Sequence, residues 1–166
     1  MSLSIRKAQR ADLPALTELY ARARAFMADH GNPRQWAANG WPPAEILRED
    51  IDTGRGYVCV DGGRVCGAFV FLAGDEPEPG YARIEQGAWQ HPGPYGVIHR
   101  LASDGSVRGI GTFCVGWCAE RSPRLRADTH PDNIPMQRLL EKCGFVRRGI
   151  IRVPQDDDPR FAYEKE

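Results

Sequence analysis

The residues with the clearest chemical potential lie between positions 95 and 121. An apolar strand pattern there is followed by a turn-rich segment, residues 103–106, then by Gly109 and Gly111, and then by a helical pattern after Thr112. The first N–H groups of a helix have no partner inside it, and the helix dipole favours negative charge there. Glycines let those groups approach a ligand without obstruction by Cβ. The pattern therefore predicts an anion site that suits a pyrophosphate.

Two glycines separated by one residue also occur in ordinary tight turns. We therefore ask which known classes of phosphate-binding site the sequence excludes. A phosphate-loop NTPase needs a Gly-Lys pair, which this chain lacks. A dinucleotide fold needs a third glycine at fixed spacing after the first strand of a βαβ unit. Gly116 falls two positions late and inside the helix. What remains is an anion-binding helix start that follows several strands.

Two blocks of the sequence resemble the GNAT superfamily of N-acetyltransferases. Residues 106–111 are similar to that family's acyl-CoA pyrophosphate loop, Arg/Gln-x-x-Gly-x-Gly/Ala. Residues 128–133, an apolar helix pattern and then Gly144-Phe145 resemble the strand, Asn-led helix and Gly-Phe that follow this loop in the family. The blocks come in the family's order, and the N-terminal half is compatible with it but less diagnostic.

The resemblance implies an α/β (α+β) fold, a mixed, mostly antiparallel sheet flanked by helices, whose central strands splay apart. In the family, backbone groups left unpaired by the splay bind the pantetheine arm, and the loop binds the pyrophosphate mainly through N–H groups. Asn133 matches an Asn beside the cofactor, caps the last helix, or does both. The expected acetyl-CoA contacts are Leu101, Ala102, Ser106, Val107, Arg108, Gly109, Ile110, Gly111, Thr112 and Asn133.

The sequence departs from the family pattern at two positions. Ser106 stands where the family usually carries Arg or Gln, so one phosphate contact is missing or shortened. Leu140 stands where many members carry a Tyr that protonates the leaving thiolate, so that general acid is absent. Arg108 adds charge to the loop or simply faces solvent. These departures keep a second interpretation open, a non-catalytic acyl-CoA-binding or sensing module.

Acetyl transfer to an amine also needs a group that removes a proton from the incoming ammonium. Glu85 lies on a predicted strand, residues 82–87, where a carboxylate can activate a water. His99 lies on the central strand, and its unperturbed pKa is about 6.5. We rank Glu85 above His99, with a structural role as the alternative for each. His91 is expected to be an exposed loop residue.

The acceptor is expected to be a small-molecule or peptide amine. Trp36 and Trp41 lie in an irregular stretch, residues 30–43, which in the family commonly borders the acceptor site. They are predicted either to plug the core or to form walls of the substrate pocket. We expect direct attack in a ternary complex, because no cysteine is placed as an evident acyl carrier.

Composition excludes several other classes of protein. Lys and Arg total 22 and so do Asp and Glu, so nothing favours nucleic acid or an acidic membrane as a partner. No signal peptide or membrane-spanning run is present, which predicts a cytoplasmic protein. Five cysteines without a CxxC pair predict reduced, packed thiols, and no pattern completes a metal site. The resemblance leaves a homodimer as an expectation.

A chain of 166 residues predicts one domain, residues 1–166. Apolar spacing of three and four predicts helices at 12–29, at 44–52, after Thr112 and after Asp132 or Asn133. Alternating and β-branched runs bounded by turns predict the strands. These strands are residues 3–8, 57–60, 65–72, 82–87, 97–101, 124–129, 145–153 and 160–163.

Overall fold

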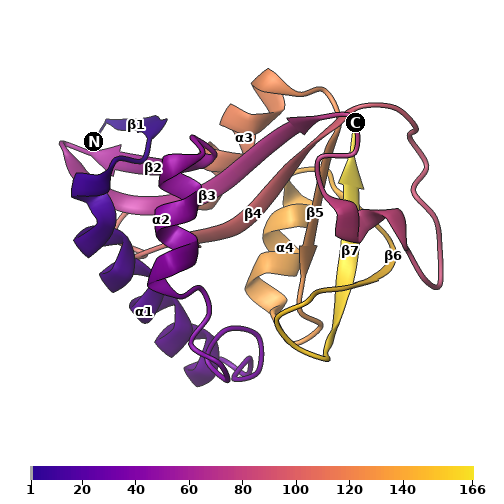
Figure 1. Ribbon diagram of the computed structural model, residues 1–166, viewed down its shortest axis with the longest axis horizontal. Coiled ribbons are helices and arrows are strands. Elements are labelled where there is room, and N and C mark those ends of the chain that lie inside the picture. The colour runs from indigo at the N-terminus through magenta and orange to yellow at the C-terminus, as the bar shows by residue number, and fades with distance from the viewer. Residues whose placement is uncertain (1) are drawn as a thin grey trace.

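The computed structural model describes residues 2–166. One seven-stranded sheet has the order β1-β2-β3-β4-β5-β7-β6 and is antiparallel except for β4 beside β5 (Figure 1). Helices flank it, so the predicted mixed, mostly antiparallel sheet is confirmed. The strands are β1 (Leu3–Lys7), β2 (Gly56–Asp61), β3 (Arg64–Gly74), β4 (Tyr95–Ser103), β5 (Leu125–Thr129), β6 (Val146–Arg152) and β7 (Pro159–Lys165), and the helices are α1 (Leu13–Asp29), α2 (Ala44–Asp52), α3 (Ile110–Arg121) and α4 (Ile134–Lys142).

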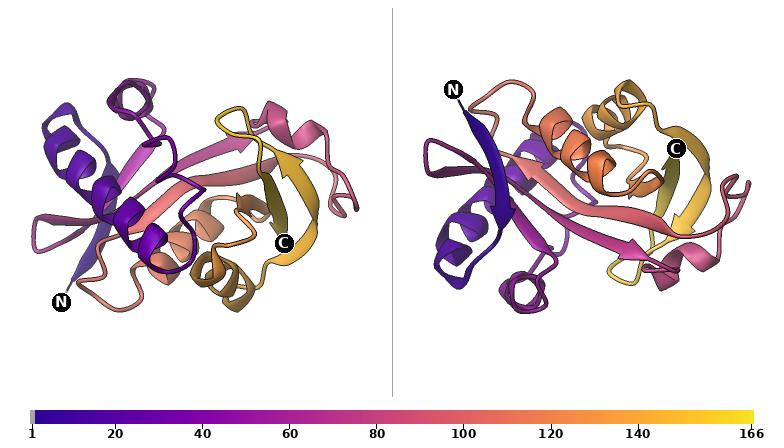
Figure 2. Two further views of the ribbon diagram at one scale, coloured as in Figure 1. Left: turned by 90° about the horizontal axis from the view of Figure 1, so that it is seen from below. Right: turned by 90° about the horizontal axis from the view of Figure 1, so that it is seen from above.

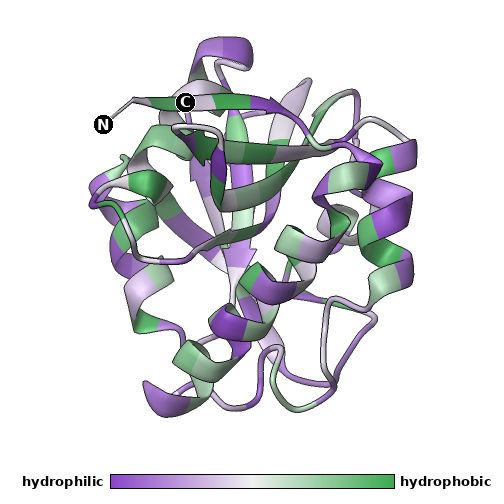
Figure 3. Ribbon diagram, turned by 90° about the vertical axis from the view of Figure 1, so that its left-hand side faces the viewer, coloured by the Kyte–Doolittle hydropathy of each residue, from purple (hydrophilic) through white to green (hydrophobic). Residues whose placement is uncertain are grey.

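Helices α1 and α2 cover one face of the sheet, and α3 and α4 cover the other (Figure 2). On the first face, Leu16 and Leu19 of α1 pack with Leu47 of α2 against Val58 and Ala68 of the sheet. The helices carry both hydrophobic and hydrophilic residues (Figure 3), because only one side of each is buried. Burial of that apolar side fixes each helix on the sheet.

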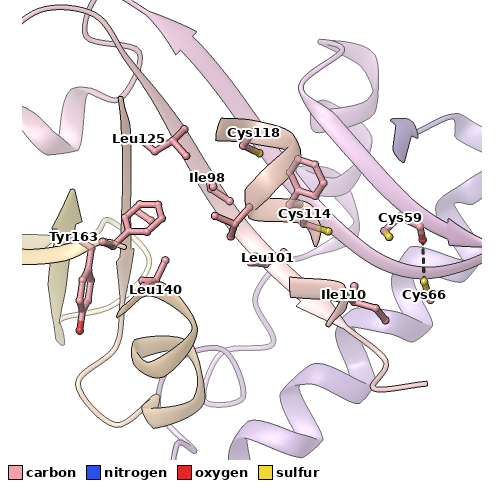
Figure 4. Close-up of a cluster of buried hydrophobic side chains, with 14 residues drawn as sticks. Cys59, Cys66, Ile98, Leu101, Ile110, Cys114, Cys118, Leu125, Leu140 and Tyr163 are labelled. Atoms are coloured by element: carbon pink, nitrogen blue, oxygen red, sulfur yellow. Dashed lines mark hydrogen bonds between the residues drawn. The ribbon is translucent and has the colours of Figure 1, made fainter. Parts of the chain in front are cut away.

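The second face is packed against α3 and α4 (Figure 4). Cys114 and Cys118 of α3 are fully buried there with Cys59 and Cys66 of the sheet. The prediction that these thiols pack in the core is confirmed. The Cys66 thiol donates to the Cys59 carbonyl oxygen over 3.4 Å.

The ends of α1 and α4 follow different local rules. Asn133 caps α4, because its Oδ1 accepts from the backbone N–H of Met136 at 3.2 Å. Asp12 occupies the corresponding position before α1, but its carboxylate accepts from Arg6 and from the N–H of Gln9. The predicted position of Asp12 is therefore right, whereas its predicted capping bond is absent from the described residues.

The strand predicted at residues 82–87 is wrong. The segment follows a short 3₁₀ turn, Pro79–Ala82, and only Glu85 pairs with the sheet, as an isolated bridge to Ile150. Gln86 then turns into the left-handed region at φ 55°, which no strand can continue. The segment is a loop held against β6 at one point.

Strands β4 and β5 diverge after a short contact, as Figure 1 shows. Their pairing consists of Gly96 opposite Leu125 and Val97 opposite Arg126. Beyond these pairs, residues 98–103 of β4 have no partner on β5. The predicted splay of the central strands is thus present in the strand register.

Candidate active site

A cavity of about 350 Å³ lies at the start of α3. We call it the helix cavity. Its walls come from β4, from the loop before α3, from the first turn of α3, from α1 and from α4. The residues around it include Ala23, Phe26, Leu101, Ala102, Val107, Gly109, Ile110, Gly111, Thr112, Asn133, Leu139 and Lys142.

The start of α3 presents free backbone donors to this cavity. The first hydrogen bond of the helix joins the Phe113 N–H to the Gly109 carbonyl oxygen at 2.9 Å. The N–H groups of Ile110, Gly111 and Thr112 have no partner within residues 2–166. A helix of this length adds its dipole to those donors. The start of α3 therefore has the unpaired donors that a phosphate group needs, and its role as the pyrophosphate site stays a prediction.

The two glycines of the loop were expected to let backbone N–H groups approach a ligand, but each has a different structural role. Gly109 has φ 86°, a conformation that glycine adopts easily, and no atom crowds the position where its Cβ would be. A Cβ on Gly111 would lie 2.8 Å from Leu139 Cδ2, so this glycine allows α4 to pack against α3. Gly109 shapes the loop, and Gly111 lets the helices approach each other.

The structure sorts the expected cofactor residues into two groups. Ser106 and Arg108 are exposed and lie outside the helix cavity, and the Ser106 hydroxyl accepts from Arg64. The other expected residues line it. Lys142 and Phe26 also line it and were missed. The Gly-Phe pattern after α4 places Lys142 at the end of that helix, which was the available signal for a cation near the phosphates.

A β-bulge interrupts β4 beside this cavity. Ala68 of β3 opposes Ala102, but Val70 opposes His99, so β4 contains one extra residue. Arg100 lies in the bulge with φ 50°, a costly conformation for a residue with a long side chain. The Tyr20 hydroxyl donates to the Arg100 carbonyl oxygen at 2.6 Å and holds the bulge in place.

A second cavity, of about 230 Å³, lies where β4 and β5 diverge. We call it the splay cavity. Ile98, His99, Ala127 and Asp128 face it from the two strands, and Glu78 faces it from the loop before β4. It meets the helix cavity, because the two share wall residues. The shared residues are Met27, Trp36, Leu101, Asn133 and Met136.

His99 lies between two carboxylates in the splay cavity. Its Nε2 is 3.6 Å from Glu78 Oε1, and its Nδ1 is 3.9 Å from Asp128 Oδ2. The buried Tyr81 hydroxyl donates to Asp128 Oδ2 at 2.7 Å and fixes that carboxylate. Glu78, Tyr81 and Asp128 were missed by sequence reasoning, because loop and strand residues far apart in the chain converge here.

Burial lowers the pKa of His99 below its ordinary value, and the attraction of Asp128 and Glu78 only partly opposes this. The imidazole is therefore neutral at pH 7 and has a free lone pair. A neutral histidine beside two carboxylates can accept a proton from an ammonium group that those carboxylates attract.

Glu85 lies outside both cavities. Its side chain is about half exposed, and its Oε2 is 3.3 Å from Arg152 Nε. Of the two candidate bases, His99 alone lies in one of the two cavities, and the assignment of the base stays a prediction. His91 is a partly exposed loop residue paired with Glu166.

The comparisons with known proteins agree with this architecture. The model of the GNAT acetyltransferase domain matches residues 2–146. The chain belongs to the GNAT acetyltransferase family. A crystal structure of a GNAT acetyltransferase from Streptococcus agalactiae is 30% identical, with a TM-score of 0.87, and the match covers 98% of this chain and 94% of that one. A search among curated proteins found no match.

Two less similar structures share the fold of this GNAT acetyltransferase. The protein yncA from Salmonella typhimurium, solved with its cofactor acetyl-CoA, is 16% identical with a TM-score of 0.63. That match covers 100% of this chain and 94% of yncA. The polyamine N-acetyltransferase of Drosophila melanogaster, which forms N-acetylagmatine, is 16% identical with a TM-score of 0.60, over 98% and 99% of the two chains.

Two loops contribute to the wall of the splay cavity in this GNAT acetyltransferase. The loop before α2 contributes Trp36 and Trp41, and the loop after β6 contributes residues 153–155. Trp36 is 5% exposed and packs in the core, and it also lines both cavities. Its role as a wall of a substrate pocket stays a prediction. Trp41 lines the splay cavity but not the helix cavity.

The same two loops are joined by polar contacts. Arg34 binds Asp158 through two hydrogen bonds of 2.7 and 2.8 Å, and Asn39 donates to the Gln155 carbonyl oxygen at 2.9 Å. The Arg34 and His130 side chains hold the pKa of Asp158 well below its ordinary value, so it is ionised at neutral pH. These contacts tie the loop that carries the two tryptophans to the loop after β6.

The GNAT site is also supported by a buried carboxylate on α2. Asp50 is 4% exposed, and its oxygens accept from Arg55 and from Arg100 at 2.7 to 3.2 Å. We expect Asp50→Asn to lower the free energy of unfolding by about 3 kcal/mol, because it leaves two part-buried guanidinium groups without their carboxylate. The melting temperature should fall by about 10 °C in a thermal scan.

Asp52→Asn is the matched control for this stability prediction. Asp52 lies on the same helix and pairs with Arg10, but both side chains are about half exposed or more. Exposed pairs contribute about 0–1 kcal/mol, so the melting temperature should barely change. Equal losses in the two variants would contradict the role given to Asp50.

None of the helices within residues 2–166 is both long and apolar enough to cross a membrane.

Proposed function

We propose that this chain transfers an acetyl group from acetyl-CoA to the amine of a small molecule or peptide, by direct attack in a ternary complex. One observation carries the proposal: the helix cavity, with its free N–H groups, shares wall residues with the splay cavity beside it, which contains a neutral histidine between two carboxylates. The acetyl-CoA bound to yncA and the amine acceptor of the Drosophila enzyme support it by analogy of fold.

The helix cavity holds the donor. Acetyl-CoA supplies the activated acyl group as a thioester. The N–H groups of Ile110, Gly111 and Thr112 bind its pyrophosphate, and Lys142 adds a positive charge at the same cavity. Leu101 and Ala102 line the path toward the splay, where β4 backbone groups without a β5 partner are free to bind a pantetheine arm.

The splay cavity holds the acceptor and removes its proton. Glu78 and Asp128 attract the protonated amine, and His99 accepts a proton from it directly or through one water. Tyr81 keeps Asp128 fixed by its hydrogen bond. Free β4 N–H groups beside the bulge are the donors available to polarise the thioester carbonyl.

In this proposal the departing thiolate takes its proton from water and not from a tyrosine. Leu140 is 2% exposed and lines the splay cavity, and no tyrosine in residues 2–166 lines either cavity. Tyr163 packs beside Leu140 in the core with its hydroxyl directed away from it (Figure 4).

We expect Tyr163→Phe to leave turnover unchanged, because its hydroxyl faces neither cavity. The measurement is the steady-state rate of thiol release from acetyl-CoA with a saturating acceptor. A loss of turnover by orders of magnitude with unchanged CoA affinity would show that a tyrosine is the acid after all.

The proposal is tested by an acceptor screen on the purified protein. Thiol release and the mass of the acetylated product are followed with acetyl-CoA and a panel of amines. Amine-dependent thiol release supports transfer. Tight CoA binding with no release above the background rate for any amine would favour the non-catalytic acyl-CoA-binding module instead. A cytoplasmic location and a homodimer stay predictions.

A further inference from the structure

The wall of the splay cavity carries an acidic pair and a basic pair, besides Arg160, which is bound to Asp156. The acidic pair is Glu78 and Asp128 around His99. The basic pair is Arg55 from the loop after α2 and Arg100 from the β4 bulge, both of which line the same cavity. An acceptor that is bound through its amine alone would contact only the acidic pair.

The basic pair has more positive charge than its partner neutralises. Asp50 is the carboxylate that both guanidinium groups share. Arg55 also approaches Glu49 at 3.7 Å, but that carboxylate is more than half exposed, and water screens it. Two guanidinium groups around one buried carboxylate leave a net positive charge at the cavity wall.

The pair also has hydrogen-bond donors to spare. Arg100 uses Nε and Nη2 on Asp50, and Arg55 uses Nε. The Nη1 group of Arg100 and both Nη groups of Arg55 have no hydrogen-bond partner within the described part of the chain. Guanidinium donors in a partly buried site suit a carboxylate, which can accept two of them at once.

The conformation of Arg100 points to the same conclusion. Its backbone is left-handed, with φ 50°, a conformation that is unfavourable for a residue other than glycine. Backbone strain of this kind concentrates at functional sites. The residue next to it in the chain is His99. The bulge therefore brings a cation and the proposed base into one cavity from consecutive residues.

Resting on the proposed function, we infer that the acceptor is a small amino acid or a close analogue, with its amine at His99, Glu78 and Asp128 and its carboxylate at Arg55 and Arg100. The cavity of about 230 Å³ suits a molecule of that size. Trp36, Trp41 and Leu72 add apolar walls, so an apolar side chain fits best.

The test compares acceptors in matched pairs, each an amino acid and the amine left when its carboxylate is removed. Leucine is paired with 3-methylbutylamine, and phenylalanine with 2-phenylethylamine. The readout is the ratio of kcat/KM within a pair, measured in the parent and in Arg55→Gln. Comparing the two proteins cancels the different basicities of the two amines.

We expect Arg55→Gln to reduce the preference for the amino acid by about 10- to 100-fold, the range for a lost charged hydrogen-bonding pair. Arg55→Lys should keep part of the preference, because the charge remains. Arg22→Gln, which removes an exposed arginine paired with Glu18, should keep all of it. Circular dichroism and CoA affinity show that each variant is folded.

A binding measurement covers the case in which Arg55→Gln turns over poorly. Leucine is titrated calorimetrically into the CoA-loaded protein, and its Kd should rise at least tenfold in Arg55→Gln but not in Arg22→Gln. An unchanged ratio and an unchanged Kd in Arg55→Gln would overturn this inference while leaving acetyl transfer intact. Failure of every amine, with or without a carboxylate, to accept acetyl would overturn the proposed function and this inference with it.

Discussion

Replacing His99 by Gln is expected to lower turnover by about 10²–10⁴-fold, the usual contribution of a general base. Glutamine keeps a polar side chain of similar length but cannot take up a proton at neutral pH. The affinity for CoA should stay the same, because His99 lines the splay cavity and not the helix cavity. Steady-state thiol release and a separate CoA titration measure the two effects.

The pH profile separates a base from a structural residue. Deprotonation of the amine substrate alone makes log kcat/KM rise with pH with a slope of about one. Below the pKa of His99, which lies under about 6.5, the parent should also show a slope of about one, because the imidazole must lose its proton before it can act as a base, but above that pKa its profile should level off, because the protonated amine is the form that binds. The His99→Gln variant should keep a slope of about one throughout. The same pH profile in both proteins would show that His99 is not the general base.

Glu85→Gln is the control for this experiment. Glu85 is bound to Arg152 at the surface and lies outside both cavities. Its rate and pH profile should match those of the parent. A large loss confined to Glu85→Gln would restore the order that the sequence alone had favoured.

The lowered pKa of His99 also affects stability, with a definite sign. The unfolded chain binds the proton at the ordinary value near 6.5, whereas the folded protein binds it only at lower pH. The free energy of unfolding therefore includes a His99 contribution that is complete above about pH 6.5 and is lost as the pH falls below it. In His99→Gln, unfolding should depend less on pH in that range.

Replacing Gly109 by Val is expected to raise the Kd for CoA by more than tenfold. Gly109 has φ 86°, and a β-branched residue there costs more than the 1–2 kcal/mol of an ordinary L-residue. The loop relieves this strain by rotating away, which turns the N–H groups of Ile110 and Gly111 from the ligand. Calorimetry or fluorescence titration with CoA measures the loss.

Gly105→Val is a matched control, because Gly105 lies four residues earlier in the same loop and also has a left-handed backbone with open space around it. Gly105 has φ 73°, and no atom lies within 4 Å of the position of its Cβ, as at Gly109. It does not line the helix cavity. The two variants should lose similar stability, but only Gly109→Val should lose CoA affinity. Equal affinities in both would refute the assignment of the pyrophosphate to the start of α3.

Local patterns predicted most of the elements. The bounds of α2 are those expected from sequence, and α1 ends at Asp29 as predicted. The hairpin around Gly62 and Gly63 also formed. Each of these depends on neighbours within one turn or one hairpin, so the sequence nearby contains the necessary information.

The site depends on contacts that local patterns do not contain. The bulge at Arg100 arises from the register between β3 and β4 and is held by Tyr20, 80 residues earlier in the chain. Glu78 reaches His99 from a loop that follows no repeating pattern. Residues 82–87 alternate like a strand, yet Gln86 turns away after a single bridge. Tertiary packing decided all three.

The short pairing of β4 with β5 has a consequence for folding and exchange. Among residues 2–166, β4 and β5 pair only through Gly96–Leu125 and Val97–Arg126. The amides of residues 98–103 that point toward β5 lack the protection of a ladder, so their hydrogens should exchange with solvent quickly in the free protein. A pantetheine arm lying along β4 would act there as an additional strand, slowing exchange and joining the two halves of the sheet.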